Sequence, residues 1–263
     1  MLRNKFSLRS KGVVAHFINK FIKKKKNTAS LGDKDIWLET ARKEQLEPKG
    51  NWTTWLILAG RGFGKTRTGA ETIRNWVESG RAKRIALIGE TEREVRQVMI
   101  EGESGLLNVG DPRLRPKFKK SQMTLKWPNG AKAIAYTAEA YEKLRGPQFD
   151  GAWIDELAKF PNAKKVWDQL MFCLRLGDCP KVIVTTTPRP VDVIQELIKN
   201  KKTYVTRGST YDNKDNLSQS YIKHLLDQYE GTRLGAQEIH AEVLSQIQGA
   251  LWTREMIQYS KVT

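Results

Sequence analysis

Residues 59–66 read Ala-Gly-Arg-Gly-Phe-Gly-Lys-Thr, a glycine-rich turn that ends in a lysine and a hydroxyl. An apolar run at 55–58 precedes the turn and a helix-like run at 67–78 follows it. Backbone N–H groups in such a loop converge on phosphate, and the dipole of the following helix adds favourable potential. We therefore predict a P-loop (Walker A) in which Lys65 reaches the β- and γ-phosphates of a nucleotide and Thr66 binds Mg²⁺. The alternative is a purely structural glycine turn.

The predicted loop departs from the usual pattern at one position. That pattern opens with glycine, and Ala59 stands there instead. Gly62 and Gly64 remain, and they allow the close backbone approach and the unusual dihedral angles that the loop needs. The candidate nucleotide-binding residues of the loop are Ala59, Gly60, Arg61, Gly62, Phe63, Gly64, Lys65 and Thr66.

A short apolar run at 151–154 ends in two carboxylates, Asp155 and Glu156, about 90 residues after Lys65. The carboxyl ends of parallel strands face the ligand crevice, so we expect these acids beside the P-loop. We predict that Asp155 holds Mg²⁺, directly or through water, and that Glu156 orients and deprotonates the attacking water. A glutamate after the metal-binding aspartate favours hydrolysis over kinase-type transfer. The alternative for two adjacent acids is a solvated turn.

Residues 181–187 form an apolar run that ends in three hydroxyls, Thr185, Thr186 and Thr187, before Pro188. A hydroxyl at the crevice can hydrogen-bond the γ-phosphate or the lytic water and report its loss after hydrolysis. The three threonines are therefore candidate coupling residues. Ordinary strand propensity is the alternative, because β-branched threonine is common in sheets.

Two arginines are candidate catalytic residues. Arg61 lies inside the glycine-rich loop, where its guanidinium would stabilise charge on the γ-phosphate. Arg145 precedes a Gly-Pro turn ten residues before Asp155, on a loop that could reach the nucleotide of a neighbouring subunit as an arginine finger. The alternative in both cases is an ordinary surface arginine.

The spacing of apolar residues predicts the elements around these motifs. Strand-like runs recur at 55–58, 84–89, 123–127, 131–136, 151–154, 181–186 and 203–206, and helical patterns at 67–78, 92–100, 163–174 and 191–199. Pro-Asn-Gly at 128–130 indicates a hairpin between two of the strands. Strands that alternate with helices predict an α/β fold with a mostly parallel sheet flanked by helices. After residue 207 only two helices are expected, at 217–229 and 232–244, as a small C-terminal lid.

Charge and composition bound the class of protein. The chain carries a net charge of +17, and nine of its Lys and Arg residues lie in residues 1–26, which hold no acid. Excess positive charge favours polyanions such as nucleic acid, although a solvated surface is the alternative. We expect residues 1–35 to be a basic, flexible arm and linker; docking to a partner protein, DNA or a membrane surface is the alternative. The sequence shows no membrane-spanning run and no secretory signal, which predicts a cytoplasmic protein that is not secreted.

Four blocks together resemble the ATPase domain of the large terminase subunit of tailed bacteriophages and gene transfer agents. They are LILAGRGFGKTRTGAE at 56–71, LRGPQFDGAWIDELAKF at 144–160, VIVTTTPRP at 182–190 and EVLSQIQGALW at 242–252. The resemblance covers residues 37–257 and implies an ASCE-type, RecA-like P-loop NTPase with ATP and Mg²⁺ as cofactors. It further implies that Gln45 is placed like the family's adenine-contacting glutamine, for which an exposed glutamine is the alternative.

The resemblance also implies a function and partners. It predicts a motor that translocates double-stranded DNA into a procapsid as a homo-oligomeric ring, with a portal and a small terminase subunit, and that grips the phosphate backbone independently of sequence. The expected division is an ATPase core at 36–206 and a helical lid and linker at 207–263. The family's nuclease domain is expected to be absent, so no nuclease activity is expected. The alternatives are another nucleic-acid translocase or helicase-like ATPase, or a nucleotide- and DNA-binding remnant of a degraded prophage.

Overall fold

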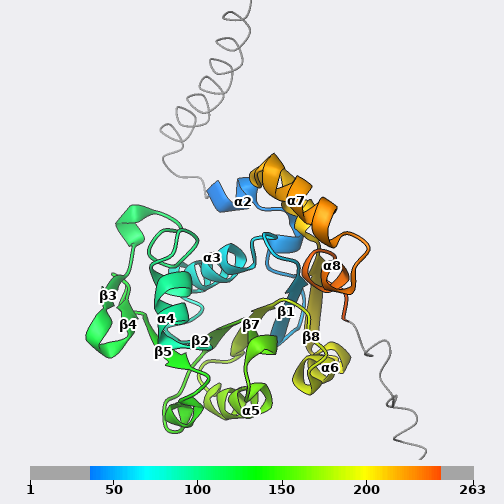
Figure 1. Cartoon of the computed structure of the whole chain (residues 1–263). Helices are drawn as coiled ribbons and strands as arrows, with labels where there is room; N and C mark the ends of the chain where they lie inside the picture. The colour runs from blue at the N-terminus through cyan, green and yellow to red at the C-terminus, as the bar shows by residue number, and fades with distance from the viewer. Residues whose placement is uncertain (1–35, 244–263) are drawn as a thin grey trace, which may run out of the picture. The chain divides into compact units, whose positions relative to one another are not determined.

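The computed structural model of the chain describes residues 36–243 (Figure 1). The predicted basic arm at 1–35, and most of the block at 242–252, lie outside this range. The chain divides into two compact units, Met1–Thr40 and Ala41–Thr263. In the first unit the structure describes one short helix, α2 (Ile36–Thr40), in which the Thr40 hydroxyl donates a hydrogen bond to the carbonyl of Ile36.

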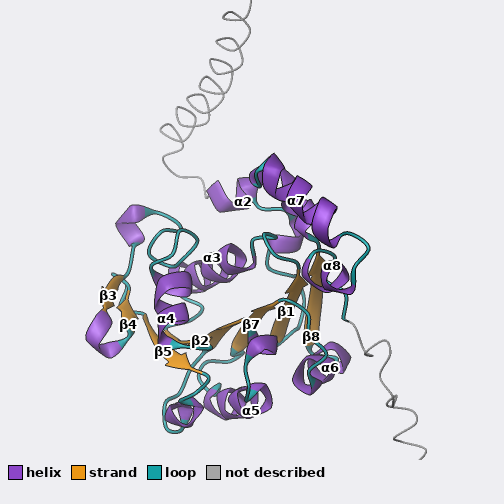
Figure 2. Ribbon diagram, viewed as in Figure 1, coloured by secondary structure: helices purple, strands orange, loops and turns teal. Residues whose placement is uncertain are grey.

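The second unit is built on one eight-stranded sheet with the order β3-β4-β5-β2-β6-β7-β1-β8 (Figure 2). In chain order the strands are β1 (Thr54–Ala59), β2 (Arg84–Gly89), β3 (Lys117–Lys119), β4 (Thr124–Lys126), β5 (Lys132–Thr137), β6 (Gly151–Asp155), β7 (Lys181–Thr186) and β8 (Thr203–Gly208). β4 runs antiparallel to β3 and β5, and every other pairing is parallel. The predicted mostly parallel α/β sheet is therefore confirmed.

The predicted hairpin joins β4 to β5. Its turn closes through the N–H of Gly130, which donates to the carbonyl of Trp127, and Gly130 takes the left-handed φ of 87° that the turn requires. β3 is not among the predicted strands, because it consists of Lys-Phe-Lys and contains no apolar run. It forms only as the antiparallel neighbour of β4.

Helices cover both faces of the sheet (Figure 1). On one face lie α3 (Lys65–Glu78), α4 (Glu92–Glu94) and the π-helical turn η2 (Val95–Ile100); on the other lie α5 (Ala163–Cys173) and α6 (Asp192–Lys199). Alternate residues of β1 enter one of two apolar cores, so that Trp55 and Ile57 pack on the α3 side and Leu56 and Leu58 on the α5 side. Both faces of β1 and β7 are buried, which explains the uninterrupted apolar runs of these two strands.

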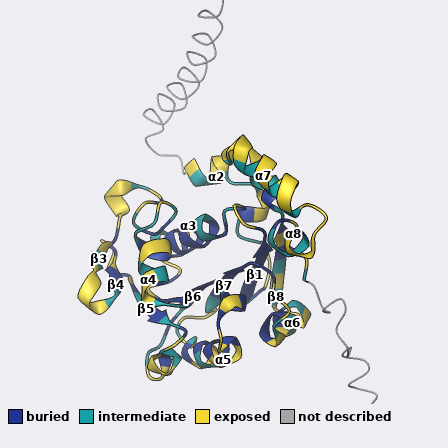
Figure 3. Ribbon diagram, viewed as in Figure 1, coloured by how far each residue is buried: buried dark blue, intermediate teal, exposed yellow. Residues whose placement is uncertain are grey.

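Two predicted helices differ from the expectation. The helix expected at 92–100 is a single α-helical turn that passes into the π-helical η2. The helix expected at 232–244 is α8 (Arg233–Glu238), which is shorter because the chain turns out of the helix soon after Ile239, where Ala241 has a left-handed φ of 59°. The helix expected at 217–229 is α7 (Gln219–Tyr229), which has no buried residue and is exposed over most of its length (Figure 3).

The remaining helical turns are of the 3₁₀ type. They are η1 (Lys43–Gln45), η3 (Pro112–Leu114), η4 (Lys120–Gln122), η5 (Tyr141–Leu144), η6 (Leu157–Lys159) and η7 (Thr210–Asn216). Within residues 36–243, no helix has the length and apolar character needed to cross a membrane.

Candidate nucleotide site

The glycine-rich loop connects the end of β1 to the start of α3, as the sequence predicts. Gly62 and Gly64 have φ values of 75° and 99°, in the left-handed region that glycine adopts without strain. Gly64 is the residue immediately before α3, and its carbonyl accepts the first helical hydrogen bond, from the N–H of Thr68 at 3.0 Å. The loop therefore presents the positive end of a 14-residue helix, where an anion is favoured.

Lys65 joins the loop to the two other predicted motifs. Its ammonium group is buried and donates to the carbonyls of Ala59 and Gly60 at 3.0 and 3.1 Å and to the hydroxyl of Thr187 at 3.1 Å. The same group lies 3.5 Å from a carboxylate oxygen of Glu156. Three segments that are far apart in the sequence thus meet at one cation.

Asp155 and Thr66 also meet. The carboxylate of Asp155 is buried, accepts a hydrogen bond from the hydroxyl of Thr185 at 2.6 Å and is hydrogen-bonded to the side chain of Thr66. Burial, followed by the negative charge of Glu156, raises the pKa of Asp155 to about 7, although Thr185, Lys65 and Thr66 oppose the shift. A carboxylate beside a hydroxyl at a buried position is the oxygen donor set that suits Mg²⁺, so the two residues fit the predicted metal role.

Glu156 turns away from the strand that carries it. Its backbone is left-handed, with φ 59° and ψ 42°, which is uncommon for a residue with a side chain. In a regular strand, the side chains of consecutive residues such as Asp155 and Glu156 point to opposite faces of the sheet. Because the backbone of Glu156 is left-handed, its side chain instead lies on the same side as that of Asp155 and reaches Lys65. The Glu156 side chain is about one-third exposed (36%), and one of its oxygens accepts the backbone N–H of Thr187 at 3.0 Å. A partly exposed carboxylate at this end of the sheet can contact water.

The three threonines at the end of β7 make three different contacts. Thr185 bonds Asp155 and also accepts the indole N–H of Trp153 at 2.8 Å. Thr186 accepts the N–H of Ala158 at 3.1 Å and so holds the chain just after the acidic pair. Of the three, Thr187 is the one whose side chain contacts Lys65.

Gln45 lies against the P-loop rather than in solvent. It is buried, its amide nitrogen donates to the hydroxyl of Thr68 at 3.2 Å, and a Cβ placed on Gly64 would lie 2.8 Å from that nitrogen. The upstream glutamine therefore borders the start of α3, next to the loop that would hold a nucleotide.

Arg42 contacts the P-loop, although no sequence pattern predicts it. Its guanidinium donates to the carbonyl of Phe63, lies over the Phe63 ring at 4.7 Å and donates to the side chain of Asn213 at 2.6 Å. Asn213 in turn donates to the carbonyl of Gly62 at 2.6 Å. No local sequence pattern marks either residue, because both act on the loop through long-range contacts.

Arg61 points toward the C-terminal helices. Its Nε lies 2.6 Å from Glu238, its backbone N–H donates to the carbonyl of Glu238 at 2.8 Å, and its carbonyl accepts the hydroxyl of Thr210. The hydrogen bond with Glu238 raises the pKa of the guanidinium. The Arg61 side chain is 69% exposed, and in this conformation its ion-pair partner is Glu238 at the end of α8 rather than Glu156 of the acidic pair.

Arg145 lies away from these contacts. It is exposed at the end of η5, which packs against α5. In the part of the chain that the structure describes, no hydrogen bond or ion pair joins its side chain to the other predicted site residues.

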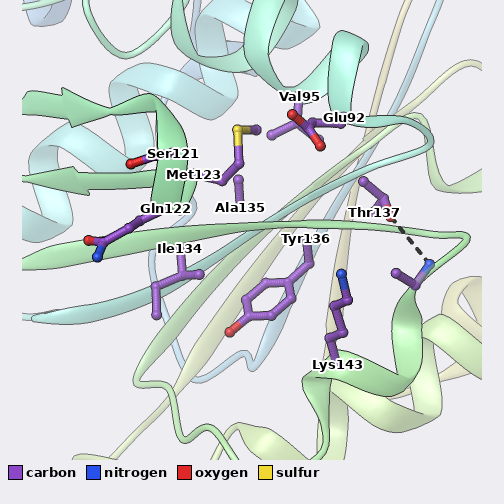
Figure 4. A pocket seen from close by; sticks show the side chains of 11 residues that line it. Glu92, Val95, Ser121, Gln122, Met123, Ile134, Ala135, Tyr136, Thr137 and Lys143 are labelled. Atoms are coloured by element: carbon purple, nitrogen blue, oxygen red, sulfur yellow. Dashed lines mark hydrogen bonds between the residues drawn. The ribbon is translucent and has the colours of Figure 1, made fainter.

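A separate hollow of about 340 Å³ lies beside β4 and β5, with Met123, Tyr136 and Thr137 among its lining side chains (Figure 4). Glu92 and Lys143 contribute opposite charges to its wall. None of the predicted nucleotide-site residues lines this hollow, so it is a different feature of the molecule.

A family model described as terminase large subunit, T4likevirus-type, N-terminal, matches residues 56–259. The chain belongs to this terminase family. The family assignment made from the four sequence blocks is therefore confirmed. No curated protein matches the chain at a significant level.

Solved structures of terminases share the fold. The large terminase of a thermophilic bacteriophage superposes with a TM-score of 0.61 at 14% identity, over 79% of this chain and 51% of that one. The ATPase domain of the Thermus phage P74-26 large terminase gives 0.55 at 15% identity, over 74% of this chain and 90% of that one. The HK97 bacteriophage large terminase gives 0.53 at 16% identity, over 74% and 47%. This terminase chain thus spans about half the length of the first and third of these proteins, and at these identities the likeness is one of fold.

Proposed function

We propose that this chain hydrolyses ATP, with Mg²⁺ as its cofactor, as the motor domain of a phage-type terminase. The observation that carries the proposal is the mutual contact of Lys65, Glu156 and Thr187 at the carboxyl end of the parallel strands. These are the cation, the base and the polar strand end that hydrolysis of a γ-phosphate needs. The family match supports the proposal, as does a related fold: the large terminase of the thermophilic bacteriophage has been solved in complex with ADP.

The residues divide the chemistry between them. Lys65 already contacts the loop carbonyls and would transfer its hydrogen bonds to the phosphate oxygens, where a charge-assisted bond is stronger. Glu156, held by the N–H of Thr187, would orient the attacking water and accept its proton. Mg²⁺ bound by Thr66 and Asp155 would neutralise charge on the phosphates.

Further roles belong to the same proposal. We infer that Gln45 contacts the adenine, that Arg61 stabilises the γ-phosphate after leaving Glu238, and that Arg145 serves a neighbouring subunit. Thr187 contacts both Lys65 and Glu156, so loss of the γ-phosphate would change the hydrogen bonds at the end of β7. Thr185 and Thr186 would pass that change to the acidic pair and to η6.

We infer that this ATPase moves double-stranded DNA into a procapsid within a homo-oligomeric ring, with a portal and a small terminase subunit as partners. Such a motor acts on any sequence, so its grip on DNA is expected to use phosphates and to weaken with salt. Of the alternatives, a helicase-like translocase and a non-enzymatic remnant gain no support from the family match.

Turnover of ATP with and without DNA tests the proposal. Glu156→Gln keeps the size of the side chain but removes the base, and we expect turnover to fall by about 10²-fold or more while nucleotide binding is retained. Glu139→Gln, at an exposed position outside the site, is the control and should hydrolyse ATP normally. Unchanged turnover in Glu156→Gln would reject the assignment of the base.

A further inference from the structure

Four cationic side chains lie next to one another across four neighbouring strands. In the register of the sheet Arg84 of β2 is opposite Lys132 of β5, Lys132 is opposite Lys126 of β4, and Lys126 is opposite Lys117 of β3. All four residues are exposed. We call Arg84, Lys132, Lys126 and Lys117 the cation row.

The row occupies a single face of the sheet. Residues directly opposite each other on paired strands point the same way, and so do residues two apart on one strand. Ala86, two residues after Arg84, packs in the α5-side core, whereas Phe118, the neighbour of Lys117, packs in the α3-side core. The row therefore lies on the α5 side, and Lys119 adds a fifth cation to the same face.

This arrangement is unfavourable in the isolated chain. Adjacent strands are about 4.8 Å apart, and like charges directly opposite each other destabilise a sheet. Within residues 36–243, no carboxylate forms an ion pair with a member of the row; the nearby Asp150 accepts the backbone N–H groups of Lys83 and Arg84. The cations are thus free to meet a negative charge from outside the chain.

Protection of a sheet edge explains only part of the row. Lysines on an edge strand prevent pairing with another chain, which would account for Lys117 and Lys119 on β3. Lys126, Lys132 and Arg84 are on internal strands, where that purpose does not apply. Lys83 extends the basic character, because it lines a hollow of about 440 Å³ together with Arg84 and Lys132.

We propose that the cation row binds the phosphate backbone of double-stranded DNA, an inference that rests on the proposed motor function. Four cations at strand spacing form a straight line of roughly 15 Å, which suits a polymer of regularly spaced charges better than a single small anion. Three of the four are lysines, which bind phosphate as point charges and carry no base preference of their own. A surface of this kind would hold DNA without reading its sequence.

The cation row lies at the amino ends of the parallel strands β2 and β5, whereas the nucleotide site lies at the carboxyl ends of the parallel strands. Arg84 and Lys132 are the first residues of β2 and β5, whereas the acidic pair, the P-loop and the threonines lie at or just after the last residues of parallel strands. A change in the row therefore leaves the ATP-binding residues in place. DNA binding and ATP turnover can be measured as separate properties.

The test measures binding of the full chain to a fluorescent 30-base-pair duplex over a range of salt concentrations. The double variant Lys126→Gln with Lys132→Gln removes two charges and keeps the side-chain length. We expect its affinity to fall at least tenfold near 0.1 M salt and the salt slope to decrease by about 1.8, or 0.9 for each lost phosphate contact. Lys201→Gln with Lys202→Gln, at exposed positions before β8 on the far edge of the sheet, removes the same charge and should change affinity much less.

ATP turnover and thermal stability of the row variant complete the test. The row variant should hydrolyse ATP at the wild-type rate without DNA and should melt no lower than the wild type, because repulsion between neighbours is relieved. An equal loss of DNA affinity in both double variants, or an unchanged DNA affinity in the row variant, would overturn the proposal. The cation row would then be interpreted as a surface that binds an acidic protein. A chain that binds DNA through the row but never hydrolyses ATP would support the row and reject the proposed motor.

Discussion

The backbone N–H of Thr187 donates to the carboxylate of Glu156 at 3.0 Å, while the hydroxyl of Thr187 contacts Lys65 at 3.1 Å. One residue at the end of β7 therefore bridges the candidate base and the candidate phosphate-binding lysine. The hydroxyl also donates to the second oxygen of Glu156, at the longer distance of 3.5 Å, so a mutation that removes it spares only the backbone contact with Glu156. Through these contacts of Thr187, loss of the γ-phosphate near Lys65 could alter the end of β7, which is the coupling expected from the sequence.

Thr187→Val removes the hydroxyl and keeps both the branched shape and the backbone N–H. We expect kcat to fall roughly tenfold, because Lys65 loses a partner while Glu156 loses only the longer of its two bonds to Thr187 and keeps the backbone one, and we expect nucleotide affinity to change little. Steady-state turnover together with binding of a fluorescent nucleotide measures both quantities. A kcat equal to that of the wild type would exclude a coupling role for the hydroxyl.

Thr186→Val should behave in the opposite way. The buried hydroxyl of Thr186 accepts the N–H of Ala158, and its loss leaves a buried donor unpaired at a cost of about 1–3 kcal/mol. We expect a lower free energy of unfolding in urea and little change in kcat at a temperature where the variant remains folded. A large loss of kcat without loss of stability would place Thr186 in the chemistry instead.

The left-handed backbone of Glu156 predicts a difference between two inactive variants. A side chain in this region costs about 1 kcal/mol, and glycine avoids that cost. Glu156→Gly should therefore be more stable than Glu156→Ala by up to about 1 kcal/mol in urea unfolding, although both lack the base and both should fail to hydrolyse ATP. Equal stability would mean that the left-handed turn carries no strain.

Asp155 predicts a pH dependence of stability in the absence of Mg²⁺. Its pKa rises from 3.8 to about 7 in the folded chain, so the folded state keeps a proton that the unfolded state releases at lower pH. The free energy of unfolding should therefore fall as pH rises from about 4 through 7, by at most about 4 kcal/mol from this residue. Asp155→Asn removes that loss, and its Tm relative to the wild type should be higher at pH 8 than at pH 5.

Added Mg²⁺ provides the complementary test of Asp155. A cation that binds the ionised carboxylate stabilises the folded chain, so Mg²⁺ should raise the Tm of the wild type at pH 8 and have little effect on Asp155→Asn. Thermal melts at two pH values, with and without the metal, separate the two contributions. A wild-type Tm that does not respond to Mg²⁺ would count against Asp155 and Thr66 as ligands.

The sequence by itself determined the local parts of the site. Glycine at 62 and 64, a lysine and threonine at a helix start, and polar residues at the ends of apolar runs are short-range patterns, and each specifies its own loop, strand or helix. The apolar runs also determined the mostly parallel sheet, since strands buried on both faces need uninterrupted apolar residues. The same information was enough to recognise the terminase family.

The tertiary structure decided which of these residues meet. The sequence alone does not distinguish the three threonines. The packing of β7 against β6 and β1 determines that Thr185 hydrogen-bonds Asp155, Thr186 hydrogen-bonds Ala158 and Thr187 hydrogen-bonds Lys65. Arg42 and Asn213 came to the P-loop through contacts across the fold, which no local pattern encodes. The cation row likewise exists only in the register of four strands, because its members are separated by up to 48 positions along the chain and become neighbours when the sheet forms.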